Sequence, residues 1–266
     1  MTAKLGSPTL RRVKTISFLA KLSIASSLFA PSAFSQQEQY PVHPDSKKQT
    51  GVPSGKVTQA KFANSTVYPG TDRDYWIYVP AQYKPGQAAS LMVFQDGKAY
   101  VNSATFNALD NLIHQGDIPV MIGVFINPGV VPPQNENAQA RFNRSLEYDD
   151  MSDRYSQFLI DELLPHIERA HGVTFSTDPN LRGITGASSG AICAFNVAWH
   201  RPDSFRRVYS TIGTYVGLRG GDEIPTLIRK TEPKPLRIFL QDGENDLNIY
   251  GGDWWIANQM MQRAFK

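Results

Sequence analysis

Residues 181–199 have the sequence LRGITGASSGAICAFNVAW, and this stretch decides the fold. Its start, Leu181 to Thr185, has the composition of a buried strand, and Ala191 to Trp199 resembles a helix. Between them, residues 186–190 match Gly-x-Ser-x-Gly, whose glycines permit the tight turn that projects a serine hydroxyl above a sheet edge. The pattern alone is common. Its position between a strand and a helix is what predicts that Ser188 is a nucleophile. An ordinary glycine-serine turn before a helix is the alternative.

The chain on either side alternates between apolar strands and amphipathic helices. Such alternation predicts an α/β fold with a doubly wound, mostly parallel sheet that is covered on both faces. A hairpin over 57–68 and 72–79, with its turn at 69–70, precedes this pattern. Further strands are expected at 91–94, 120–126, 208–212 and 236–240, and helices at 106–113, 155–167 and 254–265.

The N-terminus has the order of a secretory signal peptide. A basic start, an apolar run over 16–30 and small residues before position 36 predict a signal peptide at 1–35. Arg11-Arg12 leaves the twin-arginine route open, but the following residues favour the general route. A polar linker is expected at 36–56, and the catalytic domain at 57–266. The predicted location is therefore periplasmic or secreted.

Composition and charge exclude several classes of protein. With 41% hydrophobic and 19% charged residues, the 266-residue chain is neither a collagen, a coiled coil nor wholly disordered. Residues 1–35 hold five basic and no acidic residues, so the remainder carries 22 basic against 24 acidic residues. That balance lacks the excess of basic residues that is typical of nucleic-acid-binding proteins. No apolar run has membrane-spanning length, and Cys193, the single cysteine, is expected in the core.

A serine nucleophile requires an acid that orients its base, and this acid should follow a late strand. Asp246 lies a short loop beyond the strand at 236–240 and is the first choice; Glu244 is the second. A solvated acidic loop is one alternative. A calcium loop is another, since acidic residues alternate here, but Leu247 stands where such a loop requires glycine.

The developing negative charge on the ester oxygen requires two backbone N–H donors. The first expected donor is Ser189, the residue after the nucleophile, whose hydroxyl also competes with Ser188 for the nucleophilic role. The second comes from the loop after the strand at 91–94, with Lys98 as first choice and Gly97 as second. A plain turn is the alternative there. No His-Glu-x-x-His and no phosphate-binding glycine loop is present, so we expect neither a metal nor a cofactor.

Together these segments resemble the esterase family of α/β hydrolases that includes enterochelin (enterobactin) esterases, feruloyl esterases, S-formylglutathione hydrolase and the mycolyltransferases. The resemblance runs from about Val57 to the end and is closest to the secreted enterochelin-esterase-like branch. It implies an α/β-hydrolase fold, a Ser-Asp-His or Ser-His site, and hydrolysis of a small ester, such as a siderophore, feruloyl or sugar ester. The segments that carry it are YWIYVP at 75–80, FQDG at 94–97, RSLEYD at 144–149, GASSG at 186–190 and FLQDG at 239–243.

The sequence departs from this family at the histidine. In this fold the order is serine, acid, histidine, yet no histidine follows Asp246. His200 lies 12 residues beyond Ser188 along one helix, about 18 Å away, which is too far for a base. The sequence therefore predicts that the catalytic histidine is absent, as in a C-terminally truncated member that lacks the last strand and helix. Such a chain would be a weak, poorly soluble esterase with the strand at 236–240 as a sheet edge. The other histidines are His43, His114, His166 and His171.

The missing base leaves a second function open. A hydrolase-fold protein without its base could bind a siderophore or a sugar ester without turnover. We therefore carry two hypotheses, a serine esterase and a non-catalytic binding protein.

Overall fold

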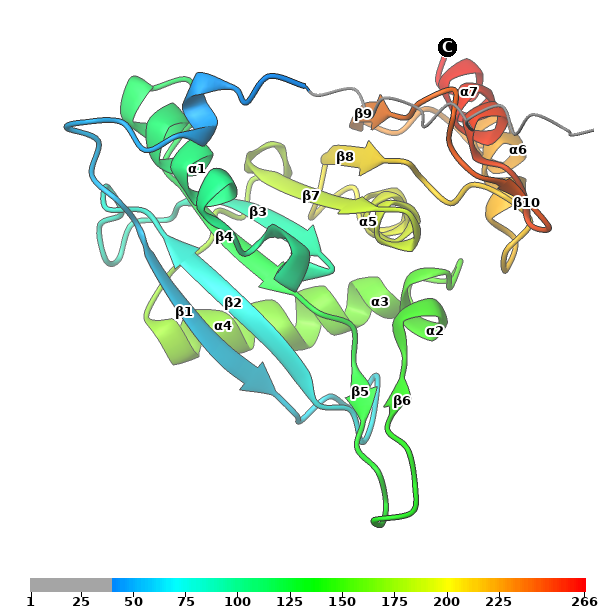
Figure 1. Cartoon of the computed structure of the whole chain (residues 1–266), viewed down its shortest axis with the longest axis horizontal. Helices are drawn as coiled ribbons and strands as arrows, with labels where there is room; N and C mark the ends of the chain where they lie inside the picture. Colours follow the sequence, from blue (N-terminus) through cyan, green and yellow to red (C-terminus); the bar gives the residue numbers. More distant parts are fainter. Residues whose placement is uncertain (1–39) are drawn as a thin grey trace, which may run out of the picture. The chain divides into compact units, whose positions relative to one another are not determined.

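The apolar runs form a seven-stranded sheet in the computed structural model, which describes residues 40–266 (Figure 1). The signal peptide expected at 1–35 and the start of the expected linker lie outside the described residues. The sheet strands are β1 (Lys56–Phe62), β2 (Arg73–Val79), β3 (Ser90–Gln95), β4 (Met121–Ile126), β7 (Arg182–Ala187), β8 (Arg207–Thr211) and β9 (Arg237–Gln241).

The order of the strands is β1-β2-β4-β3-β7-β8-β9. β1 and β2 form the expected antiparallel hairpin, and β2 is antiparallel to β4. From β4 to β9, each neighbouring pair is parallel. The carboxyl ends of β3, β7, β8 and β9 therefore meet at one edge, where open α/β sheets bind ligands.

Helices cover both faces of this sheet, as the fold prediction required. Figure 1 shows α1 on one side of the sheet and the α3–α4 segment on the other. The helices are α1 (Ser103–Gln115), α2 (Arg144–Tyr148), α3 (Arg154–Gln157), α4 (Leu164–His171), α5 (Ser189–His200), α6 (Ile224–Arg229) and α7 (Trp254–Ala264). A π-helical turn, Phe158–Leu163, joins α3 to α4, and 3-10 turns lie at Pro44–Ser46, Gly97–Tyr100, Pro179–Leu181 and Gly221–Glu223.

The alternation of side chains along β2 explains how both faces are filled. Tyr78 packs with the α1 face, where Phe94 and Phe125 stack with ring centroids 4.3 Å apart. Ile77 points to the opposite face and belongs to the cluster that contains Phe158. Residues of both faces are almost fully buried, which accounts for the near-continuous apolar strands in the sequence.

Cys193 lies on α5 in the core, 1% exposed, as predicted. Burial raises the pKa of its thiol well above the ordinary value. The thiolate that would react with oxidants or metals is therefore suppressed.

Part of the expected linker is attached to the domain. Asn111 of α1 donates its side-chain amide to the carbonyl oxygens of Asp45 and Lys47, both at 2.8 Å. The amide of Gly55 donates to Asp110 Oδ1 at 2.8 Å. Both side chains are buried on α1, and asparagine and aspartate in a helix gave no sequence signal for this docking.

Two small hairpins were not expected from the sequence. β5 (Val130–Val131) pairs with β6 (Arg141–Phe142), and β10 (Asn248–Ile249) pairs with β11 (Gly252–Asp253). Figure 1 shows the β5–β6 hairpin projecting beyond the main sheet, and β10 close to α6 and α7. Two-residue strands are too short for a period to be detected.

β9 is one edge of the sheet formed by the described residues, as predicted. Phe239 on this strand is 63% exposed and contacts Tyr209 of β8 edge-to-face. Within residues 40–266, none of the helices combines the length and hydropathy that crossing a membrane requires.

Candidate active site

Ser188 occupies the turn between β7 and α5, as the sequence predicted. Its backbone has φ 57° and ψ −123°, in a region that residues other than glycine rarely adopt. A Cβ on Gly186 would lie 2.4 Å from the carbonyl carbon of Gly190, so only glycine at 186 permits this approach. Such a conformation costs free energy and tends to occur where function requires it.

The Ser188 hydroxyl contacts a residue that the sequence analysis missed. Its Oγ lies 3.1 Å from Oγ1 of Thr214, which is 1% exposed. Trp254 Nε1 lies 3.4 Å from the same Oγ1 and can only donate. Thr214 accepts this bond, so its own hydrogen is available to Ser188 Oγ. Thr214 follows β8, and the shared edge of parallel carboxyl ends was the signal that could have found it.

The predicted oxyanion loop adjoins the elbow. Gly97 is buried, and a Cβ on it would lie 2.3 Å from the backbone of Phe125 and of Ile126. The N–H of Lys98, the first-choice donor, already donates to Asn127 Oδ1 at 3.0 Å. This bond favours Gly97, the second choice, as the donor from this loop. Ser189, the other predicted donor, is the buried first residue of α5.

The predicted acid follows β9 at the same sheet edge. Asp246 Oδ1 accepts the N–H of Leu247 at 2.7 Å, and the Asp246 N–H donates to Gly243 O at 3.0 Å. Glu244, the second choice, is exposed. The bond from Leu247 orients the Asp246 carboxylate, which favours Asp246 over Glu244 as the acid.

Asp242 forms a carboxyl pair with Asp246 that was not anticipated. Burial, a hydrogen bond with Asp246 and repulsion by its charge raise the pKa of Asp242 to about 6. A carboxyl group whose pKa is raised on folding stabilises the fold at low pH, and this contribution is lost as the pH rises through about 6. The pair is therefore strained by like charge at neutral pH.

Asp242→Asn should remove this strain. We expect a thermal midpoint about 2–4 °C higher than that of the unchanged chain at pH 8, because amide replaces carboxylate, and little difference at pH 4. Calorimetry at both pH values measures the effect. Glu244→Gln, an exposed neighbour, is the matched control. A midpoint that rises equally at both values would contradict the titration of Asp242.

The five histidines are all described, and four of them have contacts away from the elbow. His200 Nε2 lies 2.9 Å from Met151 O, and His171 Nε2 lies 3.0 Å from the Tyr75 hydroxyl. His166 packs on the Phe62 ring, with centroids 5.0 Å apart. His43 contacts Asp45, and His114 is exposed in the last turn of α1. None of the contacts among described residues joins a histidine to Ser188 or Asp246.

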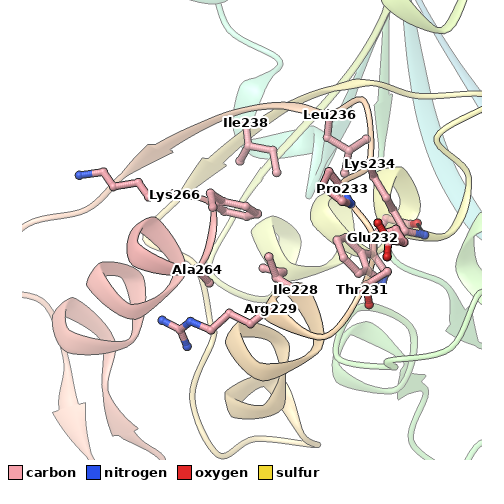
Figure 2. Close-up of a pocket in the computed structure, with 12 residues that line it drawn as sticks. Ile228, Arg229, Thr231, Glu232, Pro233, Lys234, Leu236, Ile238, Ala264 and Lys266 are labelled. Carbon is pink, nitrogen blue, oxygen red and sulfur yellow. Dashed lines mark hydrogen bonds between the residues drawn. The ribbon is translucent and has the colours of Figure 1, made fainter.

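A cavity of about 600 Å³ lies beside β9, α6 and α7, away from these residues. Figure 2 shows Leu236, Ile238 and Ile228 pointing into it. Its lining includes none of the predicted site residues. Volume alone therefore does not locate the chemistry, which follows from the elbow and the strand ends.

A buried ion pair joins β2 to α2. Arg73 Nη1 and Nη2 donate to Glu147 Oε2 and Oε1 at 2.6 and 3.0 Å, and both side chains are fully buried. Gly129 N–H also donates to Glu147 Oε2, at 3.2 Å. Glu147 belongs to α2, whose five residues were too few to be recognised as a helix from their spacing.

Comparison with known sequences decides the family. The profile described as "Putative esterase" matches residues 66–217, which includes β2, the oxyanion loop and the elbow. The chain belongs to this esterase family. The Bacillus subtilis (strain 168) protein named "Uncharacterized protein YbbA" is 23% identical over 185 residues, which cover 66% of the esterase chain and 69% of that protein.

Solved structures share the fold of this esterase-like hydrolase. The enterobactin esterase FES of Shigella flexneri is 20% identical with a TM-score of 0.63, over 86% of this chain and 55% of that chain. Ferric enterobactin esterase of Salmonella typhimurium is 21% identical with a TM-score of 0.64, over 85% and 52%. A ferulic acid esterase of Anaeromyces mucronatus is 21% identical with a TM-score of 0.51, over 64% and 62%. The chain thus spans about half the length of the enterobactin esterases that it matches.

Proposed function

We propose that the protein is a serine carboxylic-ester hydrolase with Ser188 as its nucleophile. The observation that carries the proposal is the φ 57°, ψ −123° conformation of Ser188 between a parallel strand and a helix N-terminus. This geometry presents the hydroxyl and places backbone N–H groups beside it. Family membership supports the same chemistry.

In the proposed reaction, Ser188 Oγ attacks the ester carbonyl carbon and loses its proton to a base. The oxyanion accepts hydrogen bonds from the N–H groups of Ser189 and Gly97, with Lys98 as the alternative to Gly97. The tetrahedral intermediate expels the alcohol, which takes the proton, and leaves an acyl-enzyme on Ser188. Water then attacks the acyl carbon and releases the acid. Hydrolysis by this route requires no cofactor.

The base is the open part of this mechanism. The proposed role of Asp246 is to orient an imidazole, but four of the five histidines have partners elsewhere and His114 is exposed on α1. Losing a triad histidine alone costs about 10⁶ in kcat in a serine protease. We therefore propose that the 266-residue chain is a weak esterase.

The proposed substrate is a small ester. The matched structures include an enterobactin esterase and a ferulic acid esterase, which supports siderophore, feruloyl or sugar esters as the class to test. We also propose that the protein is periplasmic or secreted, on the basis of residues 1–35. N-terminal sequencing of the protein recovered from cell fractions tests this, and an intact Met1 in the cytoplasmic fraction would contradict it.

A fluorophosphonate probe tests the nucleophile. We expect slow covalent labelling that maps to Ser188 by peptide mass spectrometry, because the elbow exposes this hydroxyl to an electrophile. Added imidazole should accelerate labelling by supplying a base. Labelling that maps to Ser189, or none with imidazole present, would contradict the proposal.

A second function is favoured by the histidine contacts. If no base reaches Ser188, the protein could hold an ester without cleaving it. A chain that binds a feruloyl ester by calorimetry but does not label with the probe would establish this binding function.

A further inference from the structure

Asp96 lies beside the elbow in a strained conformation. Its backbone is left-handed, with φ 53° and ψ 44°, immediately before Gly97. Its Oδ2 lies 3.1 Å from the position that a Cβ on Gly190 would occupy, in the first turn of α5. Few residues other than glycine adopt this conformation, although aspartate does so more readily than most, and contacts with the surroundings enforce it.

Helix α2 supplies that enforcement through two side chains one turn apart. Arg144 Nε and Nη2 donate to Asp96 Oδ1 and Oδ2 at 2.8 and 2.7 Å, a bidentate pair. The Tyr148 hydroxyl accepts the Asp96 N–H at 3.1 Å and donates to Ile126 O at 3.3 Å. Residues four apart lie on one helix face, so α2 holds both the carboxylate and the backbone of Asp96.

Arg144 and Tyr148, which together clamp Asp96, are themselves held in place by their neighbours. Tyr148 is fully buried, and Glu147 between the two clamping residues forms the buried pair with Arg73. The hydrogen bond with Asp96 raises the pKa of Arg144, so the guanidinium stays charged throughout the range of ester assays. Arg144 Nη2 also reaches Ala187 O at 3.4 Å, the residue before Ser188. One helix therefore joins the loop to the elbow.

We propose that Arg144 and Tyr148 are positioning residues, which fix Asp96 so that the Gly97 N–H faces the acyl oxygen on Ser188. This inference rests on the proposed function. The Gly97 N–H stabilises the negative charge that develops on the ester oxygen in the transition state. Loss of its positioning should therefore lower kcat and leave KM nearly unchanged. Both carboxylate-facing nitrogens of Arg144 are occupied by Asp96, which separates this role from binding of a substrate anion.

The test compares Arg144→Gln, Arg144→Lys and Tyr148→Phe in the 266-residue chain. Arg201→Gln is the matched control, because Arg201 forms a similar two-bond pair with Asp203 beyond the end of α5, at 3.2 Å. Hydrolysis of p-nitrophenyl acetate with imidazole present gives kcat and KM. Hydrogen–deuterium exchange of the amides at 95–101 reports on the loop without requiring turnover.

For Arg144→Gln we expect kcat to fall about 10- to 100-fold and KM to stay within about threefold. The loop amides should exchange faster, Tyr148→Phe should act in the same direction, and Arg144→Lys should recover part of kcat. Arg201→Gln should change neither measurement. Should Arg144→Gln fail to fold, Arg144→Lys and Tyr148→Phe decide by the same criteria.

Three results would overturn the inference: unchanged exchange, faster exchange with unchanged kcat, or a raised KM with unchanged kcat. The last would make Arg144 a substrate-binding residue. If the unchanged chain neither hydrolyses ester nor labels at Ser188, the proposed function fails. The exchange measurement then decides alone whether α2 holds the loop.

Discussion

Replacing Ser188 with alanine is expected to abolish the acceleration of ester hydrolysis that added imidazole gives to the 266-residue chain. The unchanged chain should hydrolyse p-nitrophenyl acetate slowly, since the oxyanion donors and substrate binding alone give about 10³–10⁴ over water. A base positioned by the protein contributes about 10²–10⁴-fold, and a base that is free in solution contributes less than a positioned one. We therefore expect added imidazole to raise this rate at least about tenfold. Ser188→Ala should keep this residual rate and the rate of free imidazole, with no further acceleration when imidazole is added.

Initial rates of p-nitrophenolate release at neutral pH measure this effect. Ser103→Ala is the control, since Ser103 is exposed at the start of α1, away from the sheet edge. Imidazole-dependent turnover that persists in Ser188→Ala would reject Ser188 as the nucleophile. Ordinary enzymatic rates without imidazole, lost in Ser188→Ala, would instead show that a base reaches the serine.

Replacing Glu147 with alanine is expected to lower the free energy of unfolding by about 3–5 kcal/mol. The change leaves the Arg73 guanidinium fully buried, with Asn127 O at 3.2 Å and the rings of Phe158 and Tyr68 at 4.1 and 5.8 Å as neighbours that favour its charge. An uncompensated buried charge is costly. Because domains are stable by about 5–15 kcal/mol in total, this loss is a large fraction.

Urea denaturation followed by circular dichroism measures the loss. Arg201→Ala is the control, and breaking its exposed pair with Asp203 should cost no more than about 1 kcal/mol. Changing both partners, Arg73→Met with Glu147→Leu, should recover most of the stability, because apolar side chains need no partner in the core. A loss below about 1 kcal/mol in Glu147→Ala would show that water reaches Arg73.

The central strands of the sheet could be predicted because they are buried on both faces. The run predicted at 120–126 became β4, Met121–Ile126, and the run at 91–94 lies within β3, Ser90–Gln95. Burial on two faces leaves few polar residues, so composition alone marks such strands. The β5–β6 hairpin and α2 escaped prediction because each element spans too few periods of its pattern to be recognised.

The residues of the candidate site also differ in how far the sequence could predict them. Ser188 and Asp246 could be named as candidates because each follows a recognisable strand. Thr214 and Arg144 were not, because their importance depends on partners far apart in the sequence, Ser188 and Asp96. Arg144 lay within a segment that carried the family resemblance, yet nothing in the sequence named its partner.

The buried Cys193 thiol has a practical consequence for spectroscopy. It is the single cysteine of the chain, and burial suppresses its reactivity. A cysteine introduced at Tyr250, which is 91% exposed on the β10–β11 turn beside the acid loop, would be the one readily alkylated thiol. A fluorophore or spin label attached there would follow the motion of this rim as an ester enters, without further changes to the chain.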